Sequence, residues 1–552
     1  MGSEGETGTT EWGDGAVGVV ADEATRTGGE LAVAQLAREG VDVVFGLPGD
    51  QTMALLDAFY DADVRWITTR HEQATTYMAD GYARASGRPG VACVVPGVGV
   101  YNAASGLATA WACSSPVLML AGQVNRAGIG QGLGLLHDVH DQLDIVRPVT
   151  KWATRVLEPD AVAPALHEAF RQMRSGRPRP THVEAPPEAF ADSAVATTLA
   201  AAEPAPTEPD PERVADAARV LAGAERPLLI GGGGVVLGDA SAVFTEVAEL
   251  LQATVVCTRE GKGSIDDRNP LAVGTMWNNP RLRTVLDDAD VVLAVGTRLQ
   301  GFGFGPGTRI VQVDADPDEI GRNTAVEVAV PGDARLTLTA LRDALDARVP
   351  GRESRGAAVA ATRAGIEAQL RSIGPAAGIV ETLRVAIPDD AILVPDTATI
   401  SYMCHMHYRV YEPRTYLPSS FMGTLGFAYP TALGAKVGRP DRPVVAVVGD
   451  GGFLFTATEM ATAAQYSIAT VTVVFDDGAY GNSNRDQRER FGGREIGTQL
   501  RNPDWVALAG AFGIDAVSVS GPEQLGAAVR EACAADTPVV VACPIPRMPS
   551  PF

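Results

Sequence analysis

Residues 444–484 read VVAVVGDGGFLFTATEMATAAQYSIATVTVVFDDGAYGNSN, and their pattern decides the fold class. Apolar runs bounded by polar turns predict two strands joined by a helix. These elements are a strand over Val444–Val448 that runs into Gly449-Asp450-Gly451-Gly452, a helix over Thr456–Tyr466, and a strand over Thr470–Phe475 that ends at Asp476-Asp477. Open α/β sheets bind ligands at the carboxyl ends of their strands, so we expect Asp450 and Asp477 to lie side by side at such a site.

The polar residues at these strand ends suit a metal-bound diphosphate. Mg²⁺ prefers oxygen ligands, which the two aspartates and nearby loop carbonyls can supply. A glycine-rich turn lets backbone N–H groups approach an anion closely. The stretch therefore predicts a site for Mg²⁺ and a diphosphate that includes Asp450 and Asp477.

Length and composition limit the class of protein. A chain of 552 residues is too long for one hydrophobic core, and about three domains of roughly 150 to 200 residues are expected. The net charge of −22 argues against nucleic-acid and anionic-membrane partners, which would be repelled. No apolar run approaches the ~20 residues of a membrane span, and the amino terminus lacks the basic and apolar regions of a signal peptide. We therefore expect a cytoplasmic protein with small-molecule partners, and no nucleic-acid or membrane partner.

Predicted strands and helices alternate along most of the chain. Residues 1–26 lack apolar periodicity and are expected to be disordered, whereas helix and strand patterns succeed one another from Thr27 onward. Such alternation predicts a parallel sheet with helices on both faces. Similar patterns begin again at Pro227 and Ala391. The expected fold class is α/β, with three sequential doubly wound parallel-sheet domains.

Several motifs resemble those of thiamine diphosphate enzymes. GDG at Gly449–Gly451, followed by Asp476-Asp477, is similar to the GDG and Asn-Asn motif that binds the cofactor in that family. FGLPG at Phe45–Gly49, RHEQ at Arg70–Gln73 and GYAR at Gly81–Arg84 resemble the pyrimidine-binding domain of the acetolactate synthase and 2-oxo acid decarboxylase group. The resemblance covers about Thr27 to Pro544, and it implies thiamine diphosphate and Mg²⁺ as cofactors.

The resemblance implies an order of domains, and composition marks a break between two of them. The Ala/Pro-rich, acidic stretch at 192–214 indicates a linker. The expected segments are a pyrimidine-binding domain at 27–191, the linker at 192–214, a central Rossmann-like domain at 215–350, a linking helix at 351–376, a diphosphate- and Mg-binding domain at 377–545 and a tail at 546–552.

The resemblance also implies roles for individual residues. The metal ligands would be Asp450, Asp477 and the carbonyl of Ala479. The cofactor-binding residues would be Gly449, Gly451, Gly452 and Phe453 at the diphosphate, Ser401 in a second diphosphate segment, Leu425 beneath the cofactor, and Glu72 at the aminopyrimidine. Without the family, Glu72 is equally a first-turn glutamate that complements a helix dipole, and Leu425 is a core leucine beside a glycine turn.

The metal motif departs from the family at Asp476-Asp477, where Asn-Asn is usual. Asp is also a hard oxygen ligand, so the metal site is retained. Two carboxylates already neutralise Mg²⁺, however, and leave the diphosphate charge for dipoles and helix termini to balance. We therefore predict that the cofactor binds, with an affinity weakened by the extra charge.

The sequence of the central domain does not decide which ligand it binds. A strand over Leu228–Ile230 runs into Gly231–Gly234, which by itself is a weak nucleotide signal. In relatives this domain holds FAD, ADP or nothing. GTRL at Gly296–Leu299 resembles the relatives, whereas Gly274–Trp277 does not match their flavin-contacting segment. FAD, ADP and an empty site all remain open here.

Local residues must separate the reactions of the family, because its members include decarboxylases, carboligases and lyases. Acetolactate synthases have a lysine, a Phe-Gln pair and a GQHQ segment where this chain has Pro187, Leu136-His137 and Thr399–Tyr402. The expected function is the making or breaking of a C–C bond next to a carbonyl, as in a 2-oxo acid decarboxylase and carboligase. The alternatives are a 2-hydroxyacyl-CoA lyase, which acts on an acyl-CoA, and a non-catalytic cofactor-binding homologue.

Proton transfer requires a titratable group within reach of the reacting atoms. Beside Glu72, we take Gln123 and Glu489 as catalytic candidates; the histidines considered are His71, His137, His140 and His405. A lone histidine is more often structural, and Glu489 lies in an Arg/Glu run that is equally a solvated helix face. In the family the active site lies between two subunits, which implies a homodimer or homotetramer. The six cysteines form no CxxC pair and are expected to be buried free thiols.

Overall fold

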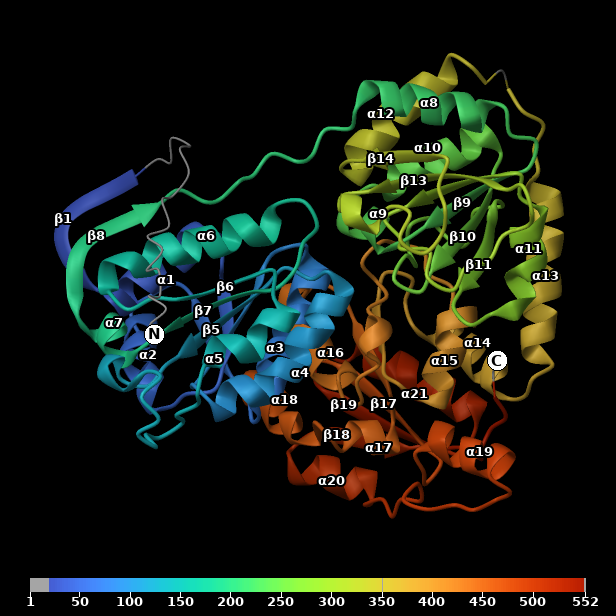
Figure 1. Cartoon of the computed structure of the whole chain (residues 1–552). Coiled ribbons are helices and arrows are strands. Elements are labelled where there is room, and N and C mark those ends of the chain that lie inside the picture. Colours follow the sequence, from blue (N-terminus) through green and yellow to red (C-terminus); the bar gives the residue numbers. More distant parts are fainter. Residues whose placement is uncertain (1–18, 350, 551–552) are drawn as a thin grey trace.

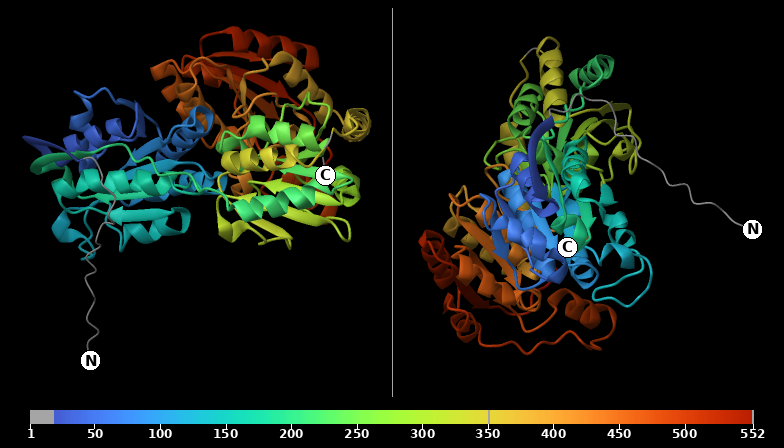
Figure 2. Two further views of the ribbon diagram at one scale, coloured as in Figure 1. Left: turned by 90° about the horizontal axis from the view of Figure 1, so that it is seen from above. Right: turned by 90° about the vertical axis from the view of Figure 1, so that its left-hand side faces the viewer.

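The computed structural model describes residues 19–349 and 351–550, which form three parallel-sheet units and a small antiparallel pair. In Figure 1 the amino-terminal unit lies on the left, the central unit at the upper right and the carboxyl-terminal unit below. Figure 2 shows the molecule from two further directions, and its left view separates the same three units. The expected α/β fold with three sequential doubly wound sheets is confirmed.

The amino-terminal unit has a six-stranded sheet in which every pairing is parallel. Its strands, in spatial order, are β3 (Arg65–Thr68), β2 (Val43–Gly46), β4 (Gly90–Val94), β5 (Val117–Gly122), β7 (Thr181–Ala185) and β6 (Trp152–Arg155). Its helices are α1 (Gly28–Arg38), α2 (Met53–Phe59), α3 (Glu72–Ser86), α4 (Val98–Cys113), α5 (Gln142–Val146), α6 (Val162–Arg174) and α7 (Pro187–Ala191).

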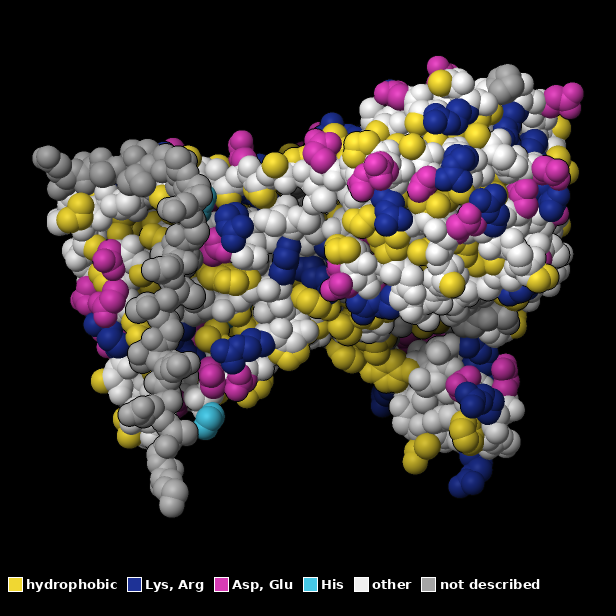
Figure 3. Space-filling model, turned by 45° about the horizontal axis from the view of Figure 1, so that its top comes forward, with side chains coloured by type: hydrophobic (Ala, Val, Ile, Leu, Met, Phe, Trp, Pro, Cys, Tyr) yellow, Lys and Arg dark blue, Asp and Glu magenta, His cyan; other side chains and the backbone are white. Residues whose placement is uncertain are grey.

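The central unit repeats this architecture, and its hydrophobic core is continuous with part of the core of the carboxyl-terminal unit. Its six parallel strands, in spatial order, are β11 (Ala272–Met276), β10 (Thr254–Thr258), β9 (Pro227–Gly231), β12 (Val291–Val295), β13 (Arg309–Asp314) and β14 (Val328–Pro331). Its helices are α8 (Pro211–Ala222), α9 (Gly233–Leu237), α10 (Ser241–Leu251), α11 (Arg283–Asp288) and α12 (Ala334–Asp346). Figure 3 shows basic and acidic side chains interspersed over this unit, at the upper right.

The carboxyl-terminal unit contains the stretch that decided the fold. Its five parallel strands, in spatial order, are β15 (Ile392–Pro395), β16 (Val444–Gly449), β17 (Val471–Asp476), β19 (Val539–Pro544) and β18 (Asp515–Ser518). Its helices are α14 (Ala376–Ala386), α15 (Thr399–His407), α16 (Ala428–Gly438), α17 (Asp450–Phe453), α18 (Met460–Tyr466), α19 (Gly481–Arg490), α20 (Trp505–Ala511) and α21 (Pro522–Ala534). Helix α13 (Gly356–Arg371) leads into this unit and packs against β11 of the central unit (Figure 1).

The first and third units share a hydrophobic core, because α3 and α16 pack closely against each other (Figure 1). Glycines allow the close approach. A Cβ atom added at Gly81 would lie 2.0 Å from the carbonyl oxygen of Thr431, and one added at Gly434 would lie 1.9 Å from that of Met78. The helix that begins at Glu72 is therefore held against the unit that carries Asp450.

Two expectations about the segment boundaries are wrong in part. Strand β1 (Val19–Thr27) pairs antiparallel with β8 (Ser193–Leu199), so residues 19–26 are not disordered; residues 1–18 lie outside the described part of the chain. The stretch expected as a linker contains β8 and the start of α8. Neither strand has a strong apolar pattern, and the pairing satisfies their backbone groups only because segments distant in sequence meet.

Two further properties concern the whole described chain. Of the six free cysteines, five are buried and Cys533 is partly exposed. Burial raises the pKa of Cys93 and of Cys113 to about 12, so both thiols remain protonated at neutral pH. Over residues 19–349 and 351–550, every helix falls short of the length and apolarity needed to cross a bilayer.

Candidate active site

A cleft of about 410 Å³ opens at the carboxyl ends of β15, β16 and β17. The register of β16 and β17 sets its floor, since Gly449 pairs with Phe475 and the chain leaves both strands at the same level. The residues that line it include Thr399, Tyr402, Leu425, Gly449, Asp450, Gly451, Gly452, Asp477, Ala479, Asn482 and Ser483. The two aspartates predicted at neighbouring strand ends therefore border one cavity.

The chain enters a helix immediately after β16. Asp450 is the first residue of α17, a single helical turn, where an irregular glycine turn was expected. The glycines are needed for space, because a Cβ atom at Gly451 would lie 2.5 Å from the ring of Tyr480. Phe453, the last residue of this turn, is buried and packs edge-on against Tyr429. The turn is thus anchored in the core while its backbone borders the cleft.

Asp450 is buried and has no cationic partner among the described residues. Its Oδ2 accepts a hydrogen bond of 2.6 Å from the Nδ2 of Asn502. Burial, with the charges of Asp477 and Asp476, raises the pKa of Asp450 to about 6. Asn502 Oδ1 is itself buried without a hydrogen-bond partner. A buried carboxylate without a cationic partner, beside a buried amide oxygen without a hydrogen-bond donor, suits a bound cation.

Asp476 and Asp477 have different environments. The carboxylate of Asp476 accepts hydrogen bonds from the side chains of Asn502 and Trp505, each at 2.7 Å, and from the backbone of Gly478 at 3.0 Å. Asp477 borders the cleft and accepts one bond, of 3.2 Å, from the backbone N–H of Ala479. Burial raises the pKa of Asp477. The first aspartate is therefore structural, and the second is available to a ligand.

Asp396 supports the loop that carries Leu425. Its carboxylate accepts hydrogen bonds from the backbone N–H of Thr397 at 2.7 Å and of Gly426 at 3.1 Å. Complete burial raises the pKa of Asp396 to about 7. A Cβ atom at Gly452 would lie 3.1 Å from its Oδ2. The buried carboxylate thus holds the Leu425 loop beside the α17 turn.

Glu72 begins α3 and is 8% exposed. Its Oε2 accepts a hydrogen bond of 3.0 Å from the Nδ2 of Asn102. Its side chain does not border the cleft of its own chain among the described residues. The preceding backbone N–H groups of Arg70 and His71 are held by the carboxylate of Glu459. The glutamate is therefore held in a fixed position away from the cleft of its own chain.

Ser401 and Gln123 are predicted site residues that do not line the cleft. Ser401 is fully buried and its hydroxyl donates to the carbonyl oxygen of Val447 at 3.2 Å, so it faces the core. Gln123 is buried, donates to Glu184 Oε1 at 3.2 Å and accepts from the backbone of Val124 at 2.7 Å. Because its amide is already satisfied and carries no titratable proton, Gln123 is a poor candidate for proton transfer.

Glu489 lies on the exposed side of α19, which agrees with its reading as a solvated helix face. His71 caps α3 by accepting from the backbone N–H of Gln73, and His137 contacts Gln51 at 3.3 Å. His405 is buried, lies 2.7 Å from the hydroxyl of Tyr416, and has its pKa lowered well below the usual range by burial and by two nearby cations. No histidine of the described residues lines the cleft.

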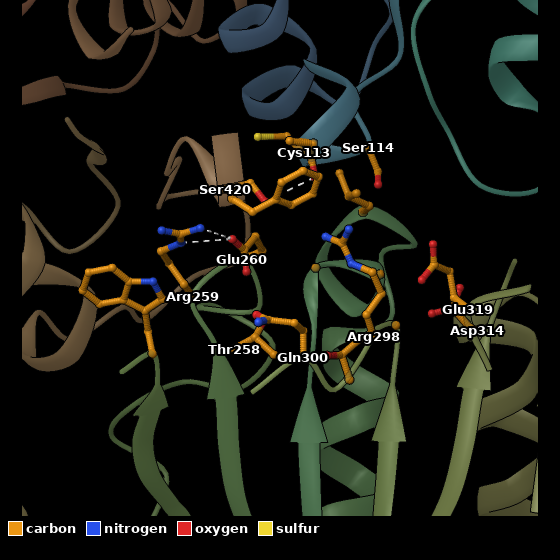
Figure 4. A pocket seen from close by; sticks show the side chains of 18 of the residues that line it. Cys113, Ser114, Thr258, Arg259, Glu260, Arg298, Gln300, Asp314, Glu319 and Ser420 are labelled. Carbon is orange, nitrogen blue, oxygen red and sulfur yellow. Dashed lines mark hydrogen bonds and ion pairs between the residues drawn. The ribbon is translucent and has the colours of Figure 1, made fainter. Parts of the chain in front are cut away.

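A second, larger cavity of about 1410 Å³ lies between the central unit and the other two. Figure 4 shows the strand ends of the central sheet below it and the end of α4 above it. Arg298 enters from the loop after β12 and stacks on Phe421 at 4.6 Å, with no carboxylate paired to it among the described residues. Asp314 stands at the end of β13, and burial raises its pKa. Arg259 is instead paired with Glu260 at 2.9 Å.

Comparison with known proteins adds the family. Three family models match in order: the N-terminal TPP binding domain of thiamine pyrophosphate enzymes at residues 26–146, their central domain at 214–341 and their C-terminal TPP binding domain at 396–543. The chain belongs to the thiamine pyrophosphate enzyme family. The resemblance stated from the GDG and RHE motifs is confirmed.

Relatives of known name fall in the expected group. The chain is 35% identical over 522 residues to a probable 2-ketoarginine decarboxylase of Pseudomonas aeruginosa, an alignment that covers 92% of this chain and 91% of the relative. It is 31% identical to a probable acetolactate synthase large subunit of Methanocaldococcus jannaschii, over 93% and 91% of the two chains. It is 30% identical to a sulfoacetaldehyde acetyltransferase of Castellaniella defragrans, over 92% and 90%.

These relatives support the predicted class, a thiamine diphosphate-dependent decarboxylase or carboligase that acts on 2-oxo acids. They lend no support to the two alternatives, a 2-hydroxyacyl-CoA lyase and a non-catalytic homologue.

The residues of the cleft fit the thiamine pyrophosphate cofactor with a metal. No three His, Cys, Asp or Glu side chains converge as a metal site in the described part of the chain, so a metal here would need oxygen atoms from other sources. The carbonyl of Ala479 accepts no backbone hydrogen bond among the described residues, and a diphosphate would add further oxygens. The short α17 turn leaves backbone N–H groups toward the same space.

Sequence reasoning missed Asn502, Asp396 and Glu459. Asn502 reaches Asp450 across 52 positions of sequence, from an Arg-Asn-Pro-Asp loop that has no periodic pattern. Asp396 follows a predicted strand, and the end of a parallel strand was the only signal that could have found it. Glu459 sits inside a predicted helix, where a buried acid has no distinctive sequence signature.

Proposed function

We propose that this enzyme decarboxylates a 2-oxo acid with thiamine diphosphate and Mg²⁺ and can ligate the resulting acyl unit to a second carbonyl compound. The observation that carries the proposal is the cleft lined by Asp450 and Asp477, which have no cationic partners among the described residues, beside a helical turn whose backbone N–H groups can hold phosphate. When bound, the cofactor supplies the nucleophilic carbon and the electron sink that cleavage next to a carbonyl requires.

Each group of residues then has a role. Asp450, Asp477 and the carbonyl of Ala479 hold the metal. The N–H groups of Gly451, Gly452 and Phe453, with Gly449 leaving room before them, hold the diphosphate. Leu425 supports the cofactor from the loop that Asp396 fixes.

Glu72 binds the aminopyrimidine through a carboxylate hydrogen bond. Its surroundings suit this role, because it is 8% exposed and its second oxygen is held by Asn102. A carboxylate oriented by a single amide keeps the other oxygen available for a ring nitrogen. Neither Gln123 nor Glu489 is assigned a catalytic role, since the first is satisfied within the protein and the second is exposed.

The active enzyme is a homodimer or a dimer of dimers. Two observations support this: Glu72 does not border the cleft of its own chain, and large apolar side chains are exposed beside both halves of the site. The exposed residues are Val98 and Tyr101 on α4 and Leu454 and Phe455 after α17. Sedimentation velocity should give a dimer or tetramer, and a monomer that retains activity would contradict the assignment. The free, mostly buried thiols suit a reducing compartment such as the cytoplasm.

The central cavity binds a nucleotide diphosphate such as ADP or the ADP half of FAD. Arg298 has no paired carboxylate among the described residues and suits phosphate, and Asp314 stands at the carboxyl end of β13, the edge at which open α/β sheets bind ligands. The absorbance of the purified enzyme separates the two ligands, because flavin is yellow and ADP is not. If the denatured enzyme releases neither ADP nor FAD, and if titration shows that the enzyme binds neither, the proposed nucleotide site is refuted.

The reaction is tested by incubating the enzyme, Mg²⁺ and thiamine diphosphate with a panel of 2-oxo acids and following the organic product by NMR. An aldehyde identifies simple decarboxylation, and a hydroxyketone or acetohydroxy acid identifies ligation. A panel that leaves every 2-oxo acid intact while the cofactor is bound would refute the proposed reaction.

A further inference from the structure

Arg485 is a buried cation on α19, the helix that follows the metal-site loop. The residue is 5% exposed. Its Nη2 donates a hydrogen bond to the side-chain oxygen of Asn482, and it forms no ion pair with a carboxylate among residues 19–349 and 351–550. A neighbour on the same helix behaves differently: Arg490 is exposed and pairs with Asp486 at 3.3 Å. A buried charge that lacks a counterion is costly, so an anion at Arg485 would be favourable.

The place of Arg485 ties it to the cofactor cleft. Asn482, its hydrogen-bond partner, lines the cleft, and so does the next residue, Ser483. Tyr402 lines the cleft from α15, and the charge of Arg485 acts on its hydroxyl, opposing the rise in the pKa of Tyr402 that burial causes. The guanidinium therefore lies at the cleft wall formed by Asn482, which it contacts, and close enough to Tyr402 for its charge to act there.

The charge balance of the cleft also calls for a cation. Asp450 and Asp477 together cancel the charge of one Mg²⁺, and the diphosphate then retains its own negative charge. In the usual family motif the second position is neutral, so this chain carries one negative charge more. Arg485 is the described cation nearest in sequence to Asp477 that is both buried and without a carboxylate partner.

We propose that Arg485 is an anion-binding residue of the cofactor cleft. Its planar guanidinium can donate two parallel hydrogen bonds to a phosphate or a carboxylate. Two sources could supply that anion: the diphosphate of the cofactor, or an acidic group at the far end of the substrate. The proposal rests on the proposed function for the presence of cofactor and 2-oxo acid in this cleft.

The carboxylate that leaves as CO₂ is a poorer match for Arg485. A cation bound to that group stabilises the ground state, and its interaction weakens as the charge moves off the departing carbon dioxide. An enzyme gains no rate from such a contact. A diphosphate or a distal acidic group keeps its charge through the reaction, so either can hold the guanidinium throughout.

The first test measures cofactor binding by quenching of intrinsic fluorescence, which needs no turnover. Arg485→Gln should raise the Kd of thiamine diphosphate by about tenfold or more if the diphosphate is the anion. Arg490→Gln, on the exposed side of the same helix, should leave the Kd within about twofold. Adding Asp477→Asn to Arg485→Gln should recover part of the lost affinity, because it removes the charge that Arg485 balances.

The second test measures substrate preference. A 2-oxo acid with a terminal carboxylate is compared with the matching terminal amide, which has the same shape and no charge. If the distal group is the anion, the wild-type enzyme prefers the carboxylate in kcat/KM, and Arg485→Gln lowers that preference by about tenfold or more, with cofactor affinity unchanged. Arg485→Lys should keep part of the preference.

The outcomes separate the proposals. A higher Kd of thiamine diphosphate for Arg485→Gln identifies the diphosphate as the bound anion. A weaker preference for the terminal carboxylate identifies the distal group of the substrate instead. Either result supports an anion site at Arg485. If folded Arg485→Gln, judged by its circular dichroism and melting temperature, matches the wild type in both tests, Arg485 is not an anion-binding residue. A wild-type enzyme that binds no thiamine diphosphate at all would instead refute the proposed function.

Discussion

The carboxylate of Glu459 lies 3.0 Å from the backbone nitrogen of His71, and the same Oε1 lies 3.0 Å from that of Arg70. Glu459 belongs to the unit that carries Asp450, whereas His71 immediately precedes Glu72. A third bond, of 2.6 Å, comes from the hydroxyl of Thr462. One buried side chain thus connects the two halves of the cofactor machinery within a chain and fixes the loop from which Glu72 emerges.

Glu459 should make stability depend on pH. Burial, the largest effect, raises its pKa to about 7 from an ordinary value of 4.5. Between these values the folded chain binds more protons than the unfolded chain, so the free energy of unfolding falls as pH rises from about 4.5 to about 7, by at most about 3 kcal/mol. Urea unfolding of the wild type and of Glu459→Gln across this pH range measures the effect. If the free energy of unfolding depends on pH in the same way in both proteins, Glu459 is not its source.

Substituting Glu72 should separate catalysis from metal binding. Glu72→Gln keeps the size of the side chain and an oxygen that can accept the hydrogen bond from Asn102. It loses the negative charge of the acceptor, so kcat should fall by about 100-fold or more. The affinity for Mg²⁺ should stay within about threefold, because the metal contacts other residues. Turnover assays and metal titration measure the two effects, and a fully active variant would refute the role of Glu72.

Neutralising Asp477 should tighten cofactor binding. Asp477→Asn keeps an oxygen ligand and removes one of the negative charges beside the diphosphate, so the Kd of thiamine diphosphate with Mg²⁺ should fall by about threefold to tenfold. Asp476→Asn is the matched comparison. It should weaken stability instead, because that carboxylate accepts bonds from Asn502 and Trp505. An unchanged Kd for Asp477→Asn would show that the charge argument is wrong.

The close packing of α3 against α16 should be intolerant of an added methyl group. Gly81→Ala places Cβ 2.0 Å from the carbonyl oxygen of Thr431, so the helices α3 and α16 must separate, at a cost of about 3 kcal/mol. Gly378→Ala in α14 is the control, since open space surrounds it and alanine favours a helix by about 1 kcal/mol. Thermal melting should show a lower Tm for the first and an equal or higher Tm for the second.

The local sequence pattern was enough to predict the fold class and the residues at the strand ends. β16 and β17 are apolar runs that end in polar residues, and parallel pairing then forces Asp450 and Asp477 together whatever the rest of the chain does. Sequence reasoning failed where a contact depends on distant segments. Ser401 was placed at the cofactor by alignment with a family segment, yet its hydroxyl is taken by the carbonyl of Val447.

The same limit explains the other differences. Asn502 contacts Asp450 only because a loop far along the chain folds back, and β1 pairs with β8 across the whole amino-terminal unit. Gln123 was taken as a candidate for proton transfer, whereas Glu184 on the adjacent strand accepts a hydrogen bond from its amide. A side chain's partners, unlike its secondary structure, are set by packing that no local window contains.

The most direct test of the central claim is the release of CO₂ from 2-oxo acids by the wild type and Glu72→Gln, with the bound cofactor quantified in both. The account predicts release that requires thiamine diphosphate and Mg²⁺ in the wild type and falls by about 100-fold or more in the variant, at equal cofactor occupancy. Equal release by both proteins, or none from a wild type with its cofactor bound, would contradict it.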